Sequence, residues 1–255
     1  MNFKCIIYEK NPPIAVIKLN RPQVLNAMNK QMWLEIQAAM EDVKTDDTIR
    51  VLIFTGEGRA FSTGADLKES KTRTLDEYRD YLEYLQKISK KIIRFEKPTI
   101  AAINGYALGS GYELALACDI RIAAKDAPIG SPEAKVSSSA TGNSFRLLHD
   151  LIGPGKAREL LFTAENIDGR TAEKIGLVNQ AVPSDQLMDT ARAMAAKIAA
   201  NSAFSITVLK QGLNRAADGE QMKSLMDFEV EACLACVSSK ERQNALSDFE
   251  SRKKS

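Results

Sequence analysis

Histidine, cysteine and tryptophan are scarce in this chain of 255 residues, which has one histidine, four cysteines and one tryptophan. Because His149 stands alone and no H-E-x-x-H or EF-hand pattern is present, the sequence does not favour metal catalysis. No serine lies in a G-x-S-x-G turn, so a Ser-His-Asp triad would have to come from residues 137–139, His149 and Asp150. We therefore expect neither a metal site nor a serine-hydrolase site.

The cysteines are too few and too irregularly spaced to predict a disulfide framework. Cys233 and Cys236 do form a C-x-x-C pair, a spacing found in zinc and redox sites. The pair lies in a helix-like stretch, however, and no second pair is present to complete a zinc site. Packing of an ordinary helix is the interpretation that we prefer.

The chain also lacks a charge excess and a long apolar run. Its 35 basic and 33 acidic side chains leave a formal net charge of +2, so nothing in the balance points to nucleic acid. No run approaches the roughly 18 apolar residues that span a bilayer, and the first residues do not resemble a signal peptide. With 44% apolar and 27% charged residues, we expect a folded cytoplasmic protein without membrane or nucleic-acid partners.

Strand-like and helix-like segments alternate in the first part of the chain. Short runs rich in β-branched residues predict strands at 14–19, 51–55, 99–103 and 119–123. Apolar residues between 32 and 43 recur at helical spacing, so strands and helices alternate as in a parallel α/β sheet. Beyond residue 185 only helices are predicted, at 185–200, 203–217, 219–237 and 239–251. We therefore divide the chain into an α/β core, 1–184, and a helical region, 185–255.

Two glycine-rich loops follow two of the predicted strands. Residues 56–68 (GEGRAFSTGADLK) follow one strand, and residues 104–113 (NGYALGSGYE) follow another and lead into a helix. A glycine-rich turn at a helix N-terminus offers unpaired N–H groups and a partial positive charge to a phosphate or an oxyanion. The second loop is neither a P-loop nor a Rossmann fingerprint, because it lacks the Gly-Lys-Ser/Thr ending and the third glycine.

Two glutamates stand beside these loops. Glu113 begins the predicted helix, and Glu133 ends the segment 129–133 (IGSPE). Taken alone, Glu113 is equally explained as a charge that complements the helix dipole, and Glu133 as a solvated side chain in a turn.

Together, the motifs resemble those of the crotonase (enoyl-CoA hydratase/isomerase) superfamily nearly from end to end. They run in the family's order: LNRP at 19–22, LNAMN at 25–29, AFSTGADLK at 60–68, KPTIAAING at 97–105, the Gly109 turn with Glu113, CDIR at 118–121, PE at 132–133, and AEKIGLVN at 172–179. The resemblance implies a crotonase-like spiral of ββα units with a helical C-terminal region. It also implies self-association as a trimer, often as a dimer of trimers, through the helical region.

The resemblance further implies an enoyl-CoA hydratase that adds water to a 2-enoyl-CoA thioester or removes it, with Glu113 and Glu133 as the acid/base pair. The backbone N–H groups of Ala65 and Ser110 would form the oxyanion hole. Coenzyme A would be part of the substrate, and no other cofactor is expected. The residues expected to line the CoA and substrate site are Gln23, Val24, Leu25, Thr63, Asp66, Leu67, Lys68 and Gly109.

The chain departs from the family pattern at two places. Ser110 occupies the middle of an expected Gly-Gly-Gly, and the segment 134–147 (AKVSSSATGNSFRL) is one residue shorter and more polar than usual. Because that segment is expected to border the acyl pocket, the acyl group or the reaction is open at this point. The alternatives are an enoyl-CoA isomerase, an acyl-CoA hydrolase or a decarboxylase of the same superfamily, and a non-catalytic ligand-binding or RNA-binding module.

Overall fold

The computed structural model describes residues 2–71 and 73–237. Its larger sheet has six strands in the order β1-β2-β3-β5-β7-β9, and only the pairing of β1 with β2 is antiparallel. The strands are β1 (Ile6–Asn11), β2 (Ile14–Leu19), β3 (Val51–Gly56), β5 (Thr99–Ile103), β7 (Ile120–Ala124) and β9 (Gln180–Val182). The four predicted strands therefore exist as β2, β3, β5 and β7.

A second sheet of three parallel strands runs beside the first, in the order β4-β6-β8. These strands are β4 (Ala60–Ser62), β6 (Tyr106–Leu108) and β8 (Ile129–Gly130). Each follows one long strand of the larger sheet and precedes helical structure, so the chain repeats a ββα unit. This confirms the spiral of ββα units and the α/β fold class.

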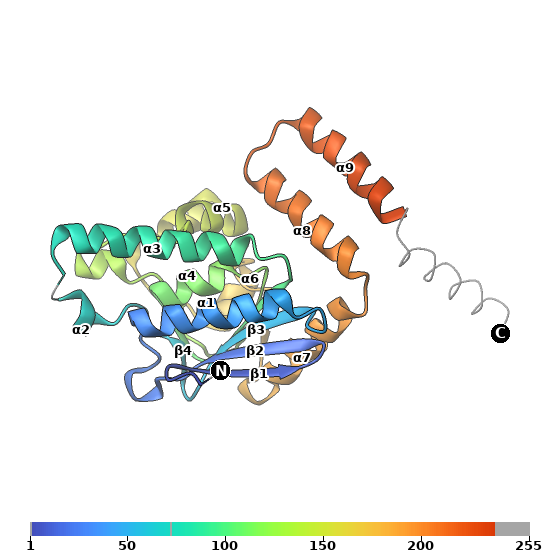
Figure 1. Ribbon diagram of the computed structural model, residues 1–255. Coiled ribbons are helices and arrows are strands. Elements are labelled where there is room, and N and C mark those ends of the chain that lie inside the picture. The colour runs from blue at the N-terminus through green and yellow to red at the C-terminus, as the bar shows by residue number, and fades with distance from the viewer. Residues whose placement is uncertain (1, 72, 238–255) are drawn as a thin grey trace.

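The described part of the chain has nine α-helices, most of which pack around the sheets (Figure 1). They are α1 (Lys30–Thr45), α2 (Leu67–Ser70), α3 (Leu75–Ile93), α4 (Ser110–Ala117), α5 (Ser144–Thr163), α6 (Gly169–Lys174), α7 (Leu187–Ala199), α8 (Ala203–Ala217) and α9 (Met222–Val237). The predicted helix at 239–251 lies outside the described residues.

The larger sheet is covered on both faces, because successive side chains of a strand point to opposite sides. Phe54 and Ile103 belong to the main core beneath α1, α3 and α4. Ile53 and Ala102, their neighbours along the strands, pack with Ala191 of α7 on the other face. Thus α7 covers the chain's own sheet, and the division at residue 184 stays a prediction.

The last two described helices differ from α7. Figure 1 shows α8 and α9 side by side and projecting away from the sheets. Lys210 is the one buried residue of α8, and α9 has none. Leu213 and Met226 are 72% and 58% exposed. These helices therefore leave apolar side chains uncovered by the described residues of the same chain.

Candidate active site

The two glycine-rich loops meet because β4 and β6, which precede them, are neighbours in the small sheet. Gly64 and Gly109 both have positive φ angles, +100° and +52°. A Cβ atom at Gly64 would lie 3.0 Å from the Leu108 carbonyl oxygen and 3.3 Å from the Ser110 nitrogen. Glycine is required for this close approach. The turns thus place the backbone of Gly64, the residue before Ala65, against that of Ser110.

Both predicted oxyanion donors are available. Ala65 pairs with Met28 in an isolated bridge, but its hydrogen bonds use the Gly64 carbonyl and the Asp66 N–H. Ser110 is the first residue of α4, where an N–H has no partner within the helix. Among the described residues, neither N–H donates to another backbone group. Two free N–H groups, one at a positive helix end, suit an oxygen that gains negative charge.

Glu113 lies in the first turn of α4 and is only 7% exposed. Thr141 holds its carboxylate: the backbone N–H donates at 2.5 Å, and the hydroxyl lies 2.9 Å from each carboxylate oxygen. Burial raises the pKa of Glu113, and the charge of Glu133 raises it further, against the lowering by the Thr141 hydrogen bonds. The net upward direction suits a proton-transfer group.

The position of Thr141 is itself fixed by the next residue. The Gly142 carbonyl accepts a hydrogen bond of 2.7 Å from the Ser89 hydroxyl on α3. Gly142 has a φ of +61°, and a Cβ there would lie 3.1 Å from the Cβ of Glu113. The polar segment 134–147 therefore has a role that its composition did not reveal. Its Thr141 donates the hydrogen bonds that hold the carboxylate of Glu113. Residues 137–139 of the same segment are exposed.

Glu133 begins a short 3-10 helix, Glu133–Val136, directly after β8 and its neighbour Ser131. The Ser131 hydroxyl donates a hydrogen bond of 2.5 Å to the carboxylate. A Cβ at Gly109 would lie 3.0 Å from Oε1 of Glu133, so this carboxylate lies against the oxyanion turn. Since β8 pairs with β6, the small sheet brings Glu133 to the same place as Glu113 and Ser110.

Tyr81 on α3 is coupled electrostatically to Glu113, and sequence reasoning missed it. Its pKa is raised to about 12, first by burial; Arg73 lowers it, Glu113 raises it, and hydrogen bonding with the Ser110 side chain lowers it. The phenol is therefore neutral at physiological pH. The spacing of Tyr81, Leu85 and Ile88 puts the tyrosine on the apolar face of a helix. That pattern is typical of core packing and does not distinguish a site residue.

The predicted CoA-binding residues lie along one strip beside these loops. Gln23 and Val24 are in the 3-10 helix Pro22–Val24, and the carbonyl of Leu25 accepts a hydrogen bond of 3.1 Å from the Thr63 N–H. Leu67 and Lys68 are exposed at the start of α2. The structure thus brings the 23–25 loop against the 63–68 loop.

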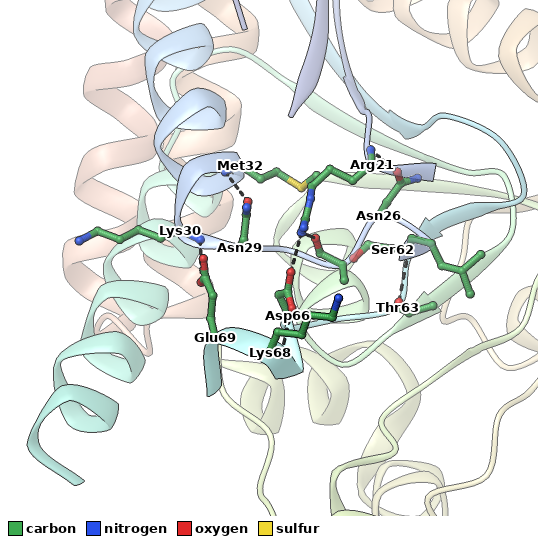
Figure 2. Close-up of polar contacts among 12 residues, drawn as sticks. Arg21, Asn26, Asn29, Lys30, Met32, Ser62, Thr63, Asp66, Lys68 and Glu69 are labelled. Carbon is green, nitrogen blue, oxygen red and sulfur yellow. Dashed lines mark hydrogen bonds and ion pairs between the residues drawn. The ribbon is translucent and has the colours of Figure 1, made fainter. Parts of the chain in front are cut away.

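Asp66 has a structural task within this strip. Figure 2 shows its carboxylate accepting from the Arg21 guanidinium, at 2.8 Å, and from the Lys68 backbone N–H, at 3.0 Å. Burial raises the pKa of Asp66, but the bonds from Arg21 and Lys68 outweigh it, so the net direction is downward. Asp66 therefore joins the 21–25 segment to the start of α2.

The features outside this site do not form a second centre. Within residues 2–71 and 73–237, no three His, Cys, Asp or Glu side chains cluster as a metal site would need. His149 is exposed and lies 3.3 Å from Asp150. Cys233 and Cys236 lie on α9, and the Ser205 hydroxyl donates to the Cys236 sulfur at 3.6 Å. None of the helices in the described ranges has the length and apolarity of a membrane span.

Comparisons with known proteins agree with this geometry. A family model described as enoyl-CoA hydratase/isomerase matches residues 9–255. The chain is 36% identical to a short-chain-enoyl-CoA hydratase of Clostridium acetobutylicum, over 100% of this chain and 97% of the relative. It is 34% identical to a crotonyl-CoA hydratase of Syntrophomonas wolfei, over 100% and 98%. A crystal structure of enoyl-CoA hydratase from Bacillus anthracis superimposes with a TM-score of 0.94, at 31% identity, covering 98% of this chain and 97% of that one.

Proposed function

The chain belongs to the enoyl-CoA hydratase/isomerase family and is an enzyme of the enoyl-CoA hydratase type, and we propose that Glu113 and Glu133 perform its proton transfers. The reaction adds water across the double bond of a 2-enoyl-CoA thioester, or removes it in reverse. The proposal rests mainly on the position of both carboxylates beside the Gly109–Ser110 turn. Glu133 lies against Gly109, and Glu113 is one helical turn beyond Ser110.

The thioester oxygen is placed between the N–H groups of Ala65 and Ser110. Attack of water on the β-carbon moves an electron pair onto this oxygen and forms an enolate. Preorganised donors stabilise such a charge by about 3 kcal/mol each in related acyl chemistry. The partial positive charge at the N-terminus of α4 acts in the same direction.

The two glutamates divide the proton transfers. Burial sets the net direction of the Glu113 pKa upward, and the donors of Thr141 act against it by stabilising the carboxylate form, which takes a proton from water as the hydroxyl group adds to the β-carbon. Glu133, as the acid, then gives a proton to the α-carbon as the enolate collapses. One proton is taken and one is given, so the total charge of the pair is unchanged. Transfer of a proton from Glu113 to Glu133 through solvent then restores the starting protonation states. No cofactor besides the CoA of the substrate takes part.

Rates with a panel of 2-enoyl-CoA esters test the proposal. Hydration is followed as the loss of conjugated thioester absorbance, for the wild type and for Glu113→Gln and Glu133→Gln. Each substitution keeps the shape of the side chain but removes its proton transfer, so we expect rates about 10²- to 10⁴-fold lower. Glu159→Gln is the matched control, because Glu159 is 55% exposed on α5 and pairs only with Lys156.

Product analysis separates this reaction from its alternatives. Release of free CoA would identify a hydrolase, and a shifted double bond would identify an isomerase. A Glu113→Gln or Glu133→Gln enzyme with the full wild-type rate would disprove the assigned acid/base pair.

We infer that α8 and α9 are covered by further copies of the same chain. Their exposed apolar side chains are Phe204, Leu209, Leu213, Met222, Met226, Val230, Leu234 and Val237. Contiguous apolar surface of this kind is typical of a subunit interface. The resemblance to a family whose members form trimers and hexamers also supports a second copy of the chain as the partner of this surface.

A further inference from the structure

Trp33, the single tryptophan of the chain, carries a buried polar group without a partner. It lies near the start of α1 and is 4% exposed. Within residues 2–71 and 73–237, its indole Nε1 is the one buried side-chain nitrogen or oxygen that has no hydrogen-bond partner. A buried N–H group without an acceptor is costly, so such groups are rare in folded proteins. The indole of Trp33 therefore needs an acceptor that the described protein atoms do not supply.

A small cavity of about 10 Å³ lies beside this residue, between α1, α3 and α4. That volume is about what one water molecule needs. The cavity is bordered by Trp33, Ser89, Glu113 and Gly142, and Glu113 is the one titratable group among the described residues that line it. The rest of the lining is aliphatic and consists of Leu85, Ile88, Ile92, Leu114 and Ala117. The cavity thus adjoins both the unpartnered indole and a proposed catalytic carboxylate.

Two groups beside the cavity can still accept hydrogen bonds. The Ser89 hydroxyl donates its hydrogen to the Gly142 carbonyl at 2.7 Å, so the lone pairs of its oxygen remain as acceptors. The Glu113 carboxylate accepts from the backbone N–H and the hydroxyl of Thr141, but its two oxygens offer about four lone-pair sites. Ser89 and Glu113 are each 7% exposed, so bulk water has little access to them.

We propose that one buried water molecule in this cavity links Trp33 to Glu113, and that Trp33 is a positioning residue for the proton transfers. The oxygen of the water accepts from the indole N–H, and its two hydrogens are donated to the Ser89 oxygen and to the Glu113 carboxylate. Three hydrogen bonds are typical of a buried water molecule. The catalytic role of Trp33 rests on the proposed function of Glu113, whereas the water site does not.

The water supports the charged form of Glu113. A hydrogen bond donated to a carboxylate stabilises its negative charge, and a water-mediated bond is nearly as favourable as a direct one. The water therefore acts in the same direction as Thr141 and against the burial that raises the pKa of Glu113. Trp33 acts on the carboxylate only through this water, because the indole has no hydrogen bond of its own to Glu113.

A high-resolution crystal structure of the wild-type enzyme tests the water site and needs neither a variant nor turnover. We expect electron density for one water molecule at about 3 Å from Nε1 of Trp33 and at about 3 Å from a carboxylate oxygen of Glu113. A structure without this density, or with a water that contacts Trp33 but not Glu113, would overturn the inference.

The indole N–H signal in nuclear magnetic resonance gives a second test in solution. One tryptophan gives one such signal, so we expect its proton shift to follow the ionisation of Glu113 as the pH changes. Glu133 and Tyr81 are the other titratable groups whose charges are coupled to Glu113, and a pKa raised to about 12 keeps Tyr81 neutral. The titration should vanish in Glu113→Gln and remain in the control Glu133→Gln. A signal that still titrates in Glu113→Gln, or never titrates in the wild type, would contradict the link.

Trp33→Phe tests the positioning role. It keeps an aromatic ring but removes the N–H group that holds the water, so we expect kcat/KM for a 2-enoyl-CoA to fall about threefold to tenfold. The acid limb of the pH profile should move to higher pH, because the Glu113 carboxylate is less well stabilised. The matched control is Leu85→Met, which changes the packing of the same cavity without removing a hydrogen-bonding group and should leave the acid limb in place. A lower rate in Trp33→Phe with an unshifted acid limb would mean that Trp33 only packs the core.

The two proposals fail in different ways. If the wild type hydrates no 2-enoyl-CoA but the indole signal titrates with Glu113, the proposed reaction is wrong and the water site stands. If the wild type hydrates a 2-enoyl-CoA and no water lies between Trp33 and Glu113, the reaction stands and this inference is wrong.

Discussion

The α/β core and the α8–α9 pair differ in how they bury their apolar side chains (Figure 1). The core buries its own apolar side chains, as Phe54 and Phe61 show by their complete burial. The pair is joined to the core by polar contacts, such as Lys210 with Asp119 at 2.7 Å and Asn214 with the Ile93 carbonyl at 3.1 Å. Many of its apolar side chains are exposed on its surface.

The candidate catalytic groups and the exposed apolar helices lie in different regions of the chain. Every candidate catalytic group, from Ala65 to Glu133, comes from the core, where packing and hydrogen bonds fix its position. Lys210 is buried in its pair with Asp119, but a buried ion pair adds little net stability because both charges lose their water, so such contacts alone would hold α8 and α9 weakly. We therefore propose that the C-terminal helices are covered by a partner copy, whereas the site depends on the core.

The largest expected effect is on assembly. The double substitution Leu213→Glu with Val230→Glu puts charges on side chains that are 72% and 57% exposed in the single chain. Unpaired charges in an apolar interface cost several kcal/mol, so we expect the oligomer to dissociate to monomers. Size-exclusion chromatography with light scattering measures the mass.

The control for this experiment places the same charge on the core. Leu75, at the start of α3, is 90% exposed, and Leu75→Glu should leave the mass unchanged. An unchanged mass in the double variant would show that α8 and α9 do not carry the interface.

The second largest expected effect is on the stability of the core, through the bonds that join α1 to the edge strand β1. Glu35 of α1 is 4% exposed and accepts hydrogen bonds from the backbone N–H groups of Lys4, Cys5 and Ile6 before and at β1. Glu35→Gln should lower the free energy of unfolding by about 2 kcal/mol, because it weakens bonds to a charged acceptor. Urea denaturation measures the change, with the exposed Glu41→Gln as the control.

The stabilisation by the Glu35 carboxylate should decrease at low pH. Burial raises the pKa of Glu35, but the bonds from Gln31 and from the backbone of residues 4–6 outweigh it, so the folded-state pKa is lowered. The stabilisation is therefore present above the unfolded pKa of glutamate and is lost as the pH falls through the folded one. If Glu35→Gln loses stability equally at every pH, the charge of Glu35 is not the cause.

A third, smaller effect concerns the support of the catalytic centre by Thr141. Thr141→Val removes the hydroxyl at 2.9 Å from Glu113 and keeps the backbone N–H. We expect kcat/KM to fall about tenfold, the equivalent of about 1.4 kcal/mol. The hydroxyl lowers the pKa of Glu113, so its loss should raise that pKa and move the acid limb of the pH profile to higher pH.

Thr141→Ser keeps a hydroxyl and should restore both the rate and the pH profile. A tenfold lower rate with an unshifted acid limb would mean that Thr141 acts on packing and not on the carboxylate of Glu113.

The smallest expected change is in the free energy of unfolding, on substitution of an ion pair at the junction of the core with α8. Asp218, at the end of α8, pairs with Arg146 at 2.8 Å and with Arg94, and its side chain is 43% exposed. The bond from Arg146 first, and the charge of Arg94, lower the pKa of Asp218. Because water and salt screen such a pair, Asp218→Asn should cost less than about 1 kcal/mol, and less again in high salt. A loss above about 2 kcal/mol in urea denaturation would contradict a weak junction.

The long buried strands were predictable, and the short ones were not. β2, β3, β5 and β7 are runs of five or six residues with a clear apolar pattern. β4 and β8 have three and two residues and lie within or beside glycine-rich loops, where no periodicity can be read. Their pairing is long-range, so it is decided by the neighbouring strands.

The sequence by itself determined the family and the candidate pair Glu113 and Glu133, because glycine-rich turns and their order along the chain are local features. It favoured the hydratase reaction but left the alternatives open. Only the tertiary structure decided what surrounds that pair. Thr141 reaches Glu113 from 28 residues away, and Tyr81 arrives from a helix whose pattern indicates only packing. The physical reason is that burial and charge coupling arise between segments far apart in the chain.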